Sequence, residues 1–451
     1  MEINEHLLDI VYRVGEQITH LEGRERKRKA EAQKHFLFGI EHLLVQLWKG
    51  TQIQEGYEGG INKRAGWYSE HPQYRDPRLT YKQTIAAYDG LIALGLIHET
   101  QRGHFSHETL EGKITRFAAT DELLSLLSEI DEDPLKVIKP NLEEQCIVMR
   151  DTIDGRKQQV AYLETPDVLA MRERLTTINQ CLARHYPDLR IKDEDWLPLQ
   201  QRIAEDPDKQ LIDLTRRTVV RIFSEGRFDR GGRFYRVWWQ NVPSEYRKYI
   251  TIDGKRTCEY DYSQLNPHMI YFLRDKELGS EDAYDRVLDG EHRDLVKEAF
   301  NAMIQASSQL LKEPEDIDLS EVEFDWPFLR KAVLDAHKPI ADMFFAGHGN
   351  FLQYVDSCMA EDVMLKFAKQ EDAAVLPVHD SFIMHYAYGD LGELEEEMRR
   401  AFHRQFKKDI RVKDEIGVML PSSFDGREVE DLSIEEIRKG PLEYSRWERR
   451  N

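Results

Sequence analysis

The segment VLPVHDSFIMH, residues 375–385, places a histidine and an aspartate between two apolar runs. Both runs are short and rich in Val, Leu, Ile and Phe, so the segment predicts a buried β-hairpin with His379 and Asp380 at its turn. A carboxylate beside a buried hairpin is costly unless something compensates its charge. A fold that contains this segment therefore needs a sheet that brings a partner to Asp380 from elsewhere in the chain.

Three further blocks precede this hairpin. TCEYDYSQLNPHMIYFL, residues 257–273, predicts an extended segment that ends at Asp261. EHRDLVKEAFNAMIQAS, residues 291–307, and NFLQYVDSCMAEDVMLKFAKQ, residues 350–370, predict helices. Because residues four apart share a helix face, the first of these helices presents one polar face. That face consists of Arg293, Lys297, Asn301 and Gln305.

Positive charge and aromatic rings are concentrated between residues 216 and 256. This segment contains eleven lysines or arginines and only four acidic residues, a local charge of +7, although the whole chain carries −20. Interleaved basic and aromatic side chains suit a nucleic-acid surface. A basic face that packs on an acidic neighbouring domain would have the same composition, so both interpretations remain open.

Length and composition limit the remaining alternatives. A chain of 451 residues predicts two or three domains, and 41% hydrophobic with 32% charged residues is typical of a globular protein. No apolar run is long enough to span a bilayer and the N-terminus does not resemble a signal peptide, so we expect a cytoplasmic protein without membrane partners. The four cysteines form no CxxC pair and predict neither disulfides nor zinc.

The N-terminal part predicts a helical segment over residues 1–34 and a winged-helix-like, possible DNA-binding domain over residues 35–130. In LTYKQTIAAYDGLIALGLIHETQRGHF, Thr80 is a candidate N-cap, Gly95 a candidate helix end, and a hairpin follows. The side chains offered to DNA would be Tyr81, Lys82, Gln83 and Thr84, with Arg102 on the hairpin.

The remaining boundaries follow from composition and periodicity. Residues 131–215 predict a linker and a thumb or scaffold region with one hairpin and one helix, and residues 413–451 predict a C-terminal tail. The fold class is therefore α+β, with the chemistry carried by residues 216–412.

In order and content these blocks resemble the palm-domain polymerases, which include bacterial DNA polymerase I and the single-subunit RNA polymerases. Asp261-Tyr-Ser-Gln resembles the first metal motif and His379-Asp-Ser the second. The helix with Arg293 and Lys297 is similar to the fingers motif that holds the incoming triphosphate. DRGGRFY, residues 229–235, is similar to the element that lies against the template hybrid. The resemblance covers about residues 215–412 and implies a compact right-hand polymerase with an antiparallel palm sheet.

The resemblance also implies roles for individual residues. Two Mg²⁺ ions, replaceable by Mn²⁺, would be held by Asp261, Asp380 and the backbone carbonyl of Tyr262. Lys297 would act at the α-phosphate or leaving group, Arg293 would hold the γ-phosphate, and His379 would orient the primer end. Asn266, Asn301 and Gln305 would also contact the nucleotide. The residues that would contact nucleic acid are Arg230, Arg233, Tyr235, Arg236, Gln353, Lys82 and Arg102.

Some positions depart from the family pattern. Asn266 stands where the DNA enzymes carry a glutamate that excludes ribonucleotides, and Gln305 stands where a tyrosine is usual. Only 32 residues separate Asp261 from Arg293, which implies reduced fingers. These features favour synthesis of RNA or primers on a DNA template, and a ribonucleotide-tolerant DNA polymerase without proofreading is the alternative. A replication-initiator-like DNA-binding protein with a non-catalytic palm is the alternative of another class. Partner proteins from replication or a mobile element are possible, and the sequence leaves the oligomeric state open.

Overall fold

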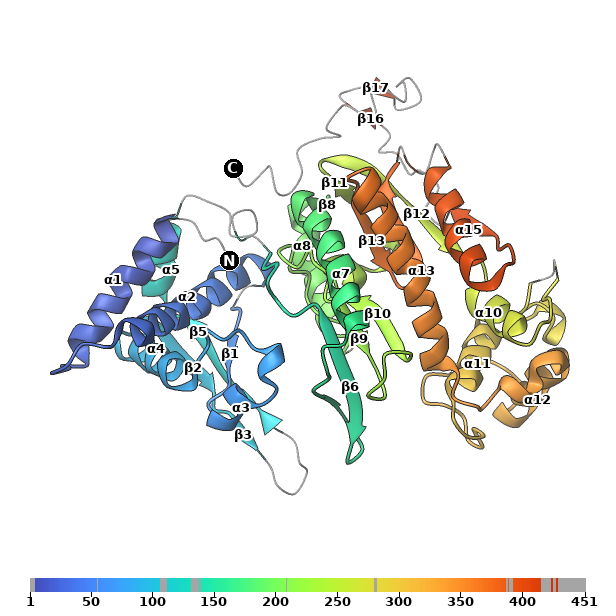
Figure 1. The fold of residues 1–451 in the computed structure, drawn as a ribbon, viewed down its shortest axis with the longest axis horizontal. Helices are drawn as coiled ribbons and strands as arrows, with labels where there is room; N and C mark the ends of the chain where they lie inside the picture. The colour runs from blue at the N-terminus through green and yellow to red at the C-terminus, as the bar shows by residue number, and fades with distance from the viewer. Residues whose placement is uncertain are drawn as a thin grey trace.

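The structure is a computed structural model whose described residues form two large hydrophobic cores, one on each side of Figure 1, and one small cluster of Val148, Val220 and Ile222. One core is formed by residues between Leu7 and Ile138, and the other by residues between Cys146 and Val412. The structure describes residues 5–54, 56–105, 112–130, 138, 140–207, 209–279, 282–386, 388, 392–414, 423–424 and 427–428. Most of the predicted tail, part of the predicted linker and the end of the hairpin near residue 106 lie outside the described residues.

The N-terminal core consists of helices packed on a small sheet (Figure 1). Its strands have the order β1-β5-β2 and all pair antiparallel. The predicted boundary at residue 34 falls inside a helix that begins at Ala30. The elements are α1 (Glu5–Leu21), α2 (Ala30–Ile53), α3 (Ala65–Ser69), α4 (Tyr81–Ala93), α5 (Asp121–Ser128), β1 (Gly59–Ile61), β2 (Ile97–Gln101), β3 (His104–Phe105), β4 (Gly112–Lys113) and β5 (Thr115–Ala119).

Helix α4 has the ends that the sequence predicts, with Thr80 at the N-cap position and Gly95 in the left-handed conformation just beyond the C-terminus, but the Thr80 side chain makes no capping hydrogen bond to the described residues. One expectation about this helix is wrong. Thr84 is buried and faces α2, where a Cβ on Gly39 would lie 3.2 Å from the Thr84 Cα. The close approach of the two helices therefore removes Thr84 from the residues that DNA could reach.

Two sheets build the larger core. The first has the order β10-β9-β6-β7, with β6 and β9 parallel and the other pairs antiparallel. The second has the order β13-β14-β12-β11-β8, with β15 also on β12, and is antiparallel throughout. The strands are β6 (Ile147–Ile153), β7 (Arg156–Gln159), β8 (Pro187–Leu189), β9 (Val220–Phe223), β10 (Gly231–Tyr235), β11 (Ile250–Ile252), β12 (Lys255–Tyr262), β13 (Val375–Val378), β14 (Ser381–His385) and β15 (Val412–Asp414), followed by the hairpin β16 (Ser423–Phe424) and β17 (Arg427–Glu428).

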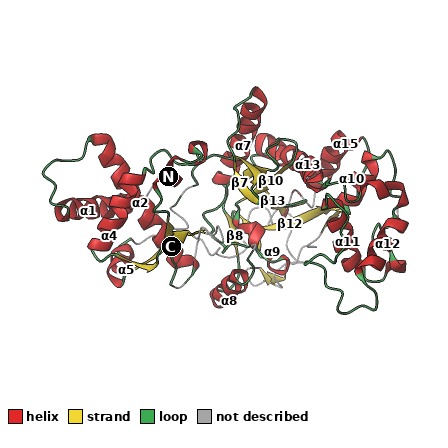
Figure 2. Cartoon of the chain, turned by 90° about the horizontal axis from the view of Figure 1, so that it is seen from below, coloured by secondary structure: helices red, strands yellow, loops and turns green. Residues whose placement is uncertain are grey.

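Helices cover these sheets (Figure 2). Helix α13 has a central place, because it packs on α7, α15, β10 and β13. Figure 1 shows α10, α11 and α12 gathered at the far end from the N-terminus. The helices are α7 (Pro166–Arg184), α8 (Asp193–Ala204), α9 (Ser244–Arg247), α10 (Leu265–Leu273), α11 (Arg293–Gln305), α12 (Trp326–Ala336), α13 (Gly349–Gln370) and α15 (Glu393–Phe406).

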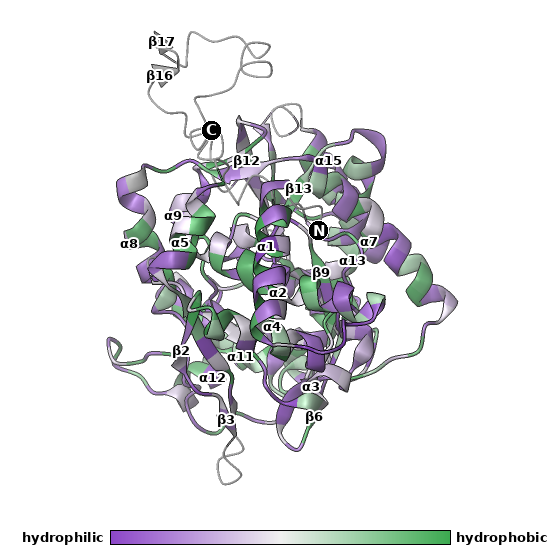
Figure 3. Ribbon diagram, turned by 90° about the vertical axis from the view of Figure 1, so that its left-hand side faces the viewer, coloured by the Kyte–Doolittle hydropathy of each residue, from purple (hydrophilic) through white to green (hydrophobic). Residues whose placement is uncertain are grey.

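Specific polar contacts connect the two cores. The Lys49 ammonium on α2 lies 2.7 Å from the buried carboxylate of Asp213. The Tyr74 hydroxyl donates to the carbonyl of Val160 and accepts from the amide of Met149. Figure 3 looks along the molecule from the N-terminal side, and α1 shows both hydrophilic and hydrophobic residues there, as its buried face of Ile10, Val14 and Ile18 requires. Among the described residues, no helix combines the length and apolar character that a membrane span needs.

Candidate active site

The two predicted metal-binding aspartates meet at one end of the antiparallel sheet. Asp261 in β12 pairs with Ser381 in β14, and Asp380 directly precedes Ser381 in the two-residue turn between β13 and β14. The other turn residue, His379, has a φ of 58°, which histidine tolerates better than β-branched residues do. Strand register thus places Asp261 next to the turn that carries Asp380, although the two residues are 119 residues apart in the sequence.

Buried contacts hold these strands on both faces. The Ser381 hydroxyl donates to Glu259 over 2.7 Å, and the same carboxylate pairs with Arg247 over 2.9 Å. On the other face, Tyr262 is buried and its hydroxyl donates to the Met398 carbonyl of α15 over 2.8 Å. The Tyr262 side chain therefore fixes the strand, and metal binding by its backbone carbonyl remains a prediction.

A buried ion pair lies behind the turn. The Arg233 Nε of β10 lies 2.7 Å from the Asp356 carboxylate of α13. Burial raises the pKa of Asp356 to about 7, Arg233 opposes this rise, and the negative charge of Asp380 adds to it. The Arg233 side chain therefore faces α13, and its predicted contact with nucleic acid remains untested.

The predicted fingers helix α11 carries two predicted phosphate-binding cations, of which one is in an ion pair and the other, among the described residues, is not. Arg293 pairs with Asp282 over 2.8 Å and with Asp285 over 3.6 Å. Lys297 is exposed and forms no ion pair with any residue that the structure describes. Asn301 lies farther along the same face of α11 and accepts a hydrogen bond over 3.0 Å from the amide of Asn266 in α10. Two predicted nucleotide-binding residues are therefore in direct contact.

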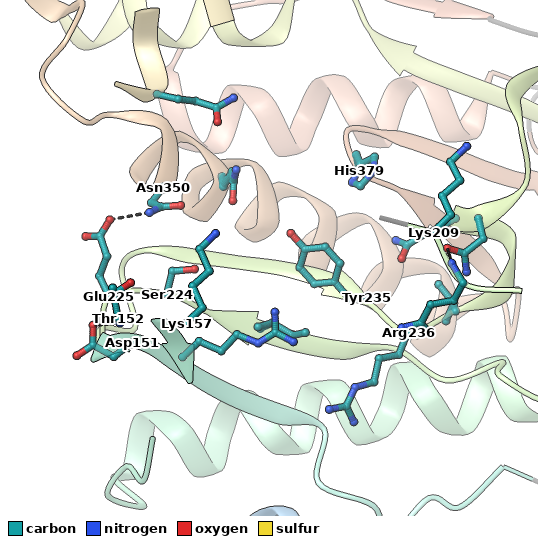
Figure 4. A pocket seen from close by; sticks show the side chains of 18 of the residues that line it. Asp151, Thr152, Lys157, Lys209, Ser224, Glu225, Tyr235, Arg236, Asn350 and His379 are labelled. Atoms are coloured by element: carbon teal, nitrogen blue, oxygen red, sulfur yellow. Dashed lines mark hydrogen bonds between the residues drawn. The ribbon is translucent and has the colours of Figure 1, made fainter. Parts of the chain in front are cut away.

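A polar pocket of about 750 Å³ adjoins the His379 turn (Figure 4). It contains five of the predicted site residues, which come from β10, α11, α13 and the turn. His379 is exposed at the pocket, but partial desolvation of its ring and the nearby Arg233 lower its pKa, which favours a neutral imidazole. The five residues are Tyr235, Arg236, Gln305, Gln353 and His379.

The pocket also contains three cations that were not singled out from the sequence. Arg150 and Lys157 come from the β6–β7 hairpin and Lys209 from the loop after α8. The hairpin itself was predicted, but only the pairing of β6 with β9 shows that it borders the basic segment. Acidic residues balance most of this charge, namely Asp151, Asp206 and Glu225.

Two predicted arginines, Arg236 of the pocket and Arg230, pair with acidic residues, and the last two predicted cations lie in the N-terminal core. Arg236 pairs with Glu144 over 3.3 Å, and Arg230 lies near Glu225 and Asp229 with its guanidinium 5.4 Å from the Phe351 ring centre. Lys82 is exposed on the first turn of α4 and Arg102 is exposed between β2 and β3. Neither of these two N-terminal cations lines the pocket beside the turn.

The two aspartates could serve as ligands of a metal ion. Asp380 is half-buried and makes no ion pair within the described part of the chain. In the described ranges, no histidine, cysteine or further acid joins the two aspartates to make a cluster of three close ligand atoms. Mg²⁺ is usually bound through one or two carboxylates together with water and substrate phosphates. Asp261 and Asp380 fit that pattern.

Comparison with family models and with curated proteins gives no match. Among solved structures, the chain is similar to the POL domain of Pol1 from M. smegmatis, solved in complex with a DNA primer-template and dNTP. The sequence identity is 14% and the TM-score 0.31, over 88% of this chain and 70% of that one. A likeness at this level carries no argument about activity, so the functional conclusion rests on the geometry of the site.

Proposed function

We propose that this chain is a template-directed nucleotidyltransferase that joins nucleoside triphosphates on a DNA template. The observation that supports this proposal best is the register of β12 and β14, which places Asp261 beside the Asp380 turn. In this proposal residues 216–412 form a compact right-hand polymerase. The antiparallel sheet is the palm, and α11 with its neighbours forms small fingers.

The residues of this site have complementary roles in the proposal. Two Mg²⁺ ions bound by Asp261 and Asp380 would activate the attacking hydroxyl and hold the leaving pyrophosphate. Lys297 contacts the phosphates, and its lack of an ion pair leaves the ammonium available. Arg293 reaches the γ-phosphate only when it leaves Asp282, so nucleotide binding exchanges one anionic partner for another. The neutral His379 orients the primer end.

The N-terminal part would present the DNA in this proposal. The order α2, β1, α3, α4, β2 and β5, with the short strands β3 and β4 between the last two, is compatible with a winged helix and supports this part of the proposal. Lys82 on α4 and Arg102 between β2 and β3 are exposed where such domains meet a groove or phosphates.

The proposed product is RNA or a primer. The hydrogen bond between Asn266 and Asn301 puts a short amide at the predicted sugar-binding position, in place of the glutamate of the DNA enzymes, and this supports acceptance of a 2′-hydroxyl. A DNA polymerase that tolerates ribonucleotides is the second candidate, and parallel reactions with ribo- and deoxynucleotides distinguish the two.

Extension of primed and unprimed DNA in Mg²⁺ tests the proposal. Asp380→Asn should reduce incorporation by more than about 100-fold, because changes to groups that merely support metal ligands already cost about 10–100-fold. Asp335→Asn, an exposed carboxylate on α12, should behave like wild type. If wild type and Asp380→Asn are equally inactive on every template while DNA still binds, the alternative of a DNA-binding initiator with a non-catalytic palm replaces this proposal.

A further inference from the structure

Three potential metal ligands meet at the end of β13 that is remote from the Asp380 turn. Cys181 lies in the last turn of α7, His185 follows as the C-cap residue, and Asp372 lies in the turn between α13 and β13. Their ligand atoms all lie within 4.8 Å of one another. Three atoms at that spacing lie less than about 1 Å from the positions that Zn²⁺ requires, since Zn–ligand bonds are about 2.0–2.3 Å.

The histidine of this cluster has the orientation expected for a metal ligand. His185 Nδ1 lies 2.5 Å from the Asp253 carboxylate, and the other oxygen of Asp253 accepts from the Tyr186 amide over 2.9 Å. Metal-bound histidines almost always donate their second ring nitrogen to a carboxylate or carbonyl in this way. Asp253 therefore directs His185 Nε2 to the cluster, where that atom now lies 2.8 Å from the Asp372 carbonyl.

The surrounding charges are mixed. Arg184 pairs with the Asp372 carboxylate, and Arg217 donates to the His185 carbonyl over 3.3 Å. Two features offset this positive charge. The Asp253 carboxylate is negative, and the C-terminus of α7 favours a nearby positive charge through the helix dipole. Arg184 contacts only one oxygen of the exposed Asp372 carboxylate, so the second oxygen remains available to bind a metal ion.

We propose that Cys181, His185 and Asp372 bind one Zn²⁺ ion, with water in the fourth position. Thiolate, imidazole and carboxylate together select zinc over magnesium, which binds oxygen ligands. Binding releases the thiol proton of Cys181 and the ring proton of His185 Nε2 to solvent. The ion ties the end of α7 to the turn before β13, and the proposal does not depend on the polymerase assignment.

Metal analysis of the untagged 451-residue chain tests this site. The reduced protein is equilibrated with Zn²⁺ in excess Mg²⁺, desalted, and its zinc measured by mass spectrometry. Wild type should retain one zinc per chain, and Cys181→Ser and His185→Gln should retain none. Cys146→Ser, a buried thiol in the same core, is the matched control and should retain the metal.

Cobalt substitution shows whether sulfur binds the ion. Wild type with Co²⁺ should show a thiolate-to-cobalt charge-transfer band that Cys181→Ser lacks. Asp253→Asn should keep the band but bind about 10–100-fold more weakly. If Cys181→Ser does not fold, Asp372→Asn is the second variant for this test, because Asn accepts the φ of 46° at this position. Absence of zinc and of the band in wild type, or equal zinc in Cys181→Ser, overturns the proposal.

Discussion

Two buried arginines of the larger core differ in what surrounds them. Arg221 is 1% exposed and donates to the Gly232 carbonyl, to Glu361 and to Ser357. Arg256 is 6% exposed, its three guanidinium nitrogens make no hydrogen bond to the described residues, and burial lowers its pKa to about 10. The first charge is therefore compensated and the second is not.

Substitution by methionine should separate these two cases. Arg221→Met should lower the free energy of unfolding by about 3–5 kcal/mol, because it leaves buried partners without their cation. Arg256→Met should cost nothing and gain on the order of 1 kcal/mol, because it removes an unpaired buried charge. Urea unfolding of both variants checks this, and a loss of several kcal/mol in Arg256→Met would contradict it.

His337, between α12 and the following turn, provides a pH-dependent measurement. It is fully buried against Phe300 and Phe344, and burial lowers its pKa to about 4. The unfolded chain therefore binds the proton more tightly, and stability is lost as the pH falls from about 6.5 to about 4. At the acid end the loss is on the order of 3 kcal/mol, at 1.36 kcal/mol per pKa unit.

The variant His337→Phe isolates this effect. Its stability should change less than that of wild type between pH 7 and pH 4.5, because the residue that takes up the proton is gone. Urea unfolding at both pH values gives the difference. An identical pH dependence in the two proteins would show that His337 does not contribute.

At the scale of elements, the bulge in β10 fixes the predicted hybrid-binding motif to α13. Gly232 has a φ of 79°, and a Cβ there would lie 2.8 Å from the Phe223 ring and 3.0 Å from the Ser357 hydroxyl. Gly232→Ala should therefore destabilise by about 1–3 kcal/mol, the range for strained backbone positions. Gly66→Ala, in the exposed helix α3, should be neutral or slightly stabilising. Thermal unfolding of both variants tests this, and equal effects would contradict the argument.

Local patterns predict elements well in this chain. The hairpin around His379 and Asp380, the strand that ends near Asp261 and the helix that begins at Arg293 are all present. Contacts across long sequence separations could not be predicted, because periodicity carries no information about them. The pairing of Arg233 with Asp356, 123 residues apart, and the burial of Thr84 against α2 are of this kind.

The candidate zinc cluster shows the same limit. The sequence predicts no zinc site, because the cysteines lack CxxC spacing. The i, i+4 pair of Cys181 and His185 is a local signal, but the third ligand, Asp372, is 187 residues beyond His185. Only the packing of α7 on α13 brings the three together.

For the whole molecule, the question is how a chain with a net charge of −20 could hold nucleic acid. The exposed cations of the site and of the N-terminal part must act locally, over distances comparable to the Debye length. Each phosphate contact contributes about 0.9 to the slope of log K against log salt for duplex DNA and about 0.7 for a single strand. Lys82→Ala and Arg236→Ala should each reduce the magnitude of that slope by the contribution of about one phosphate contact. Arg233→Ala should change it little, because that guanidinium faces Asp356.

Fluorescence anisotropy of labelled DNA over a series of salt concentrations measures these slopes. Lys331→Ala, an exposed lysine on α12 outside both candidate surfaces, is the matched control and should retain the wild-type slope. A reduced slope for Lys82 but not Arg236 would confine DNA to the N-terminal part, and the reverse would confine it to the pocket. Equal reductions for Arg233 and Lys331 would mean that binding follows overall charge, and the proposed nucleic-acid path would then be wrong.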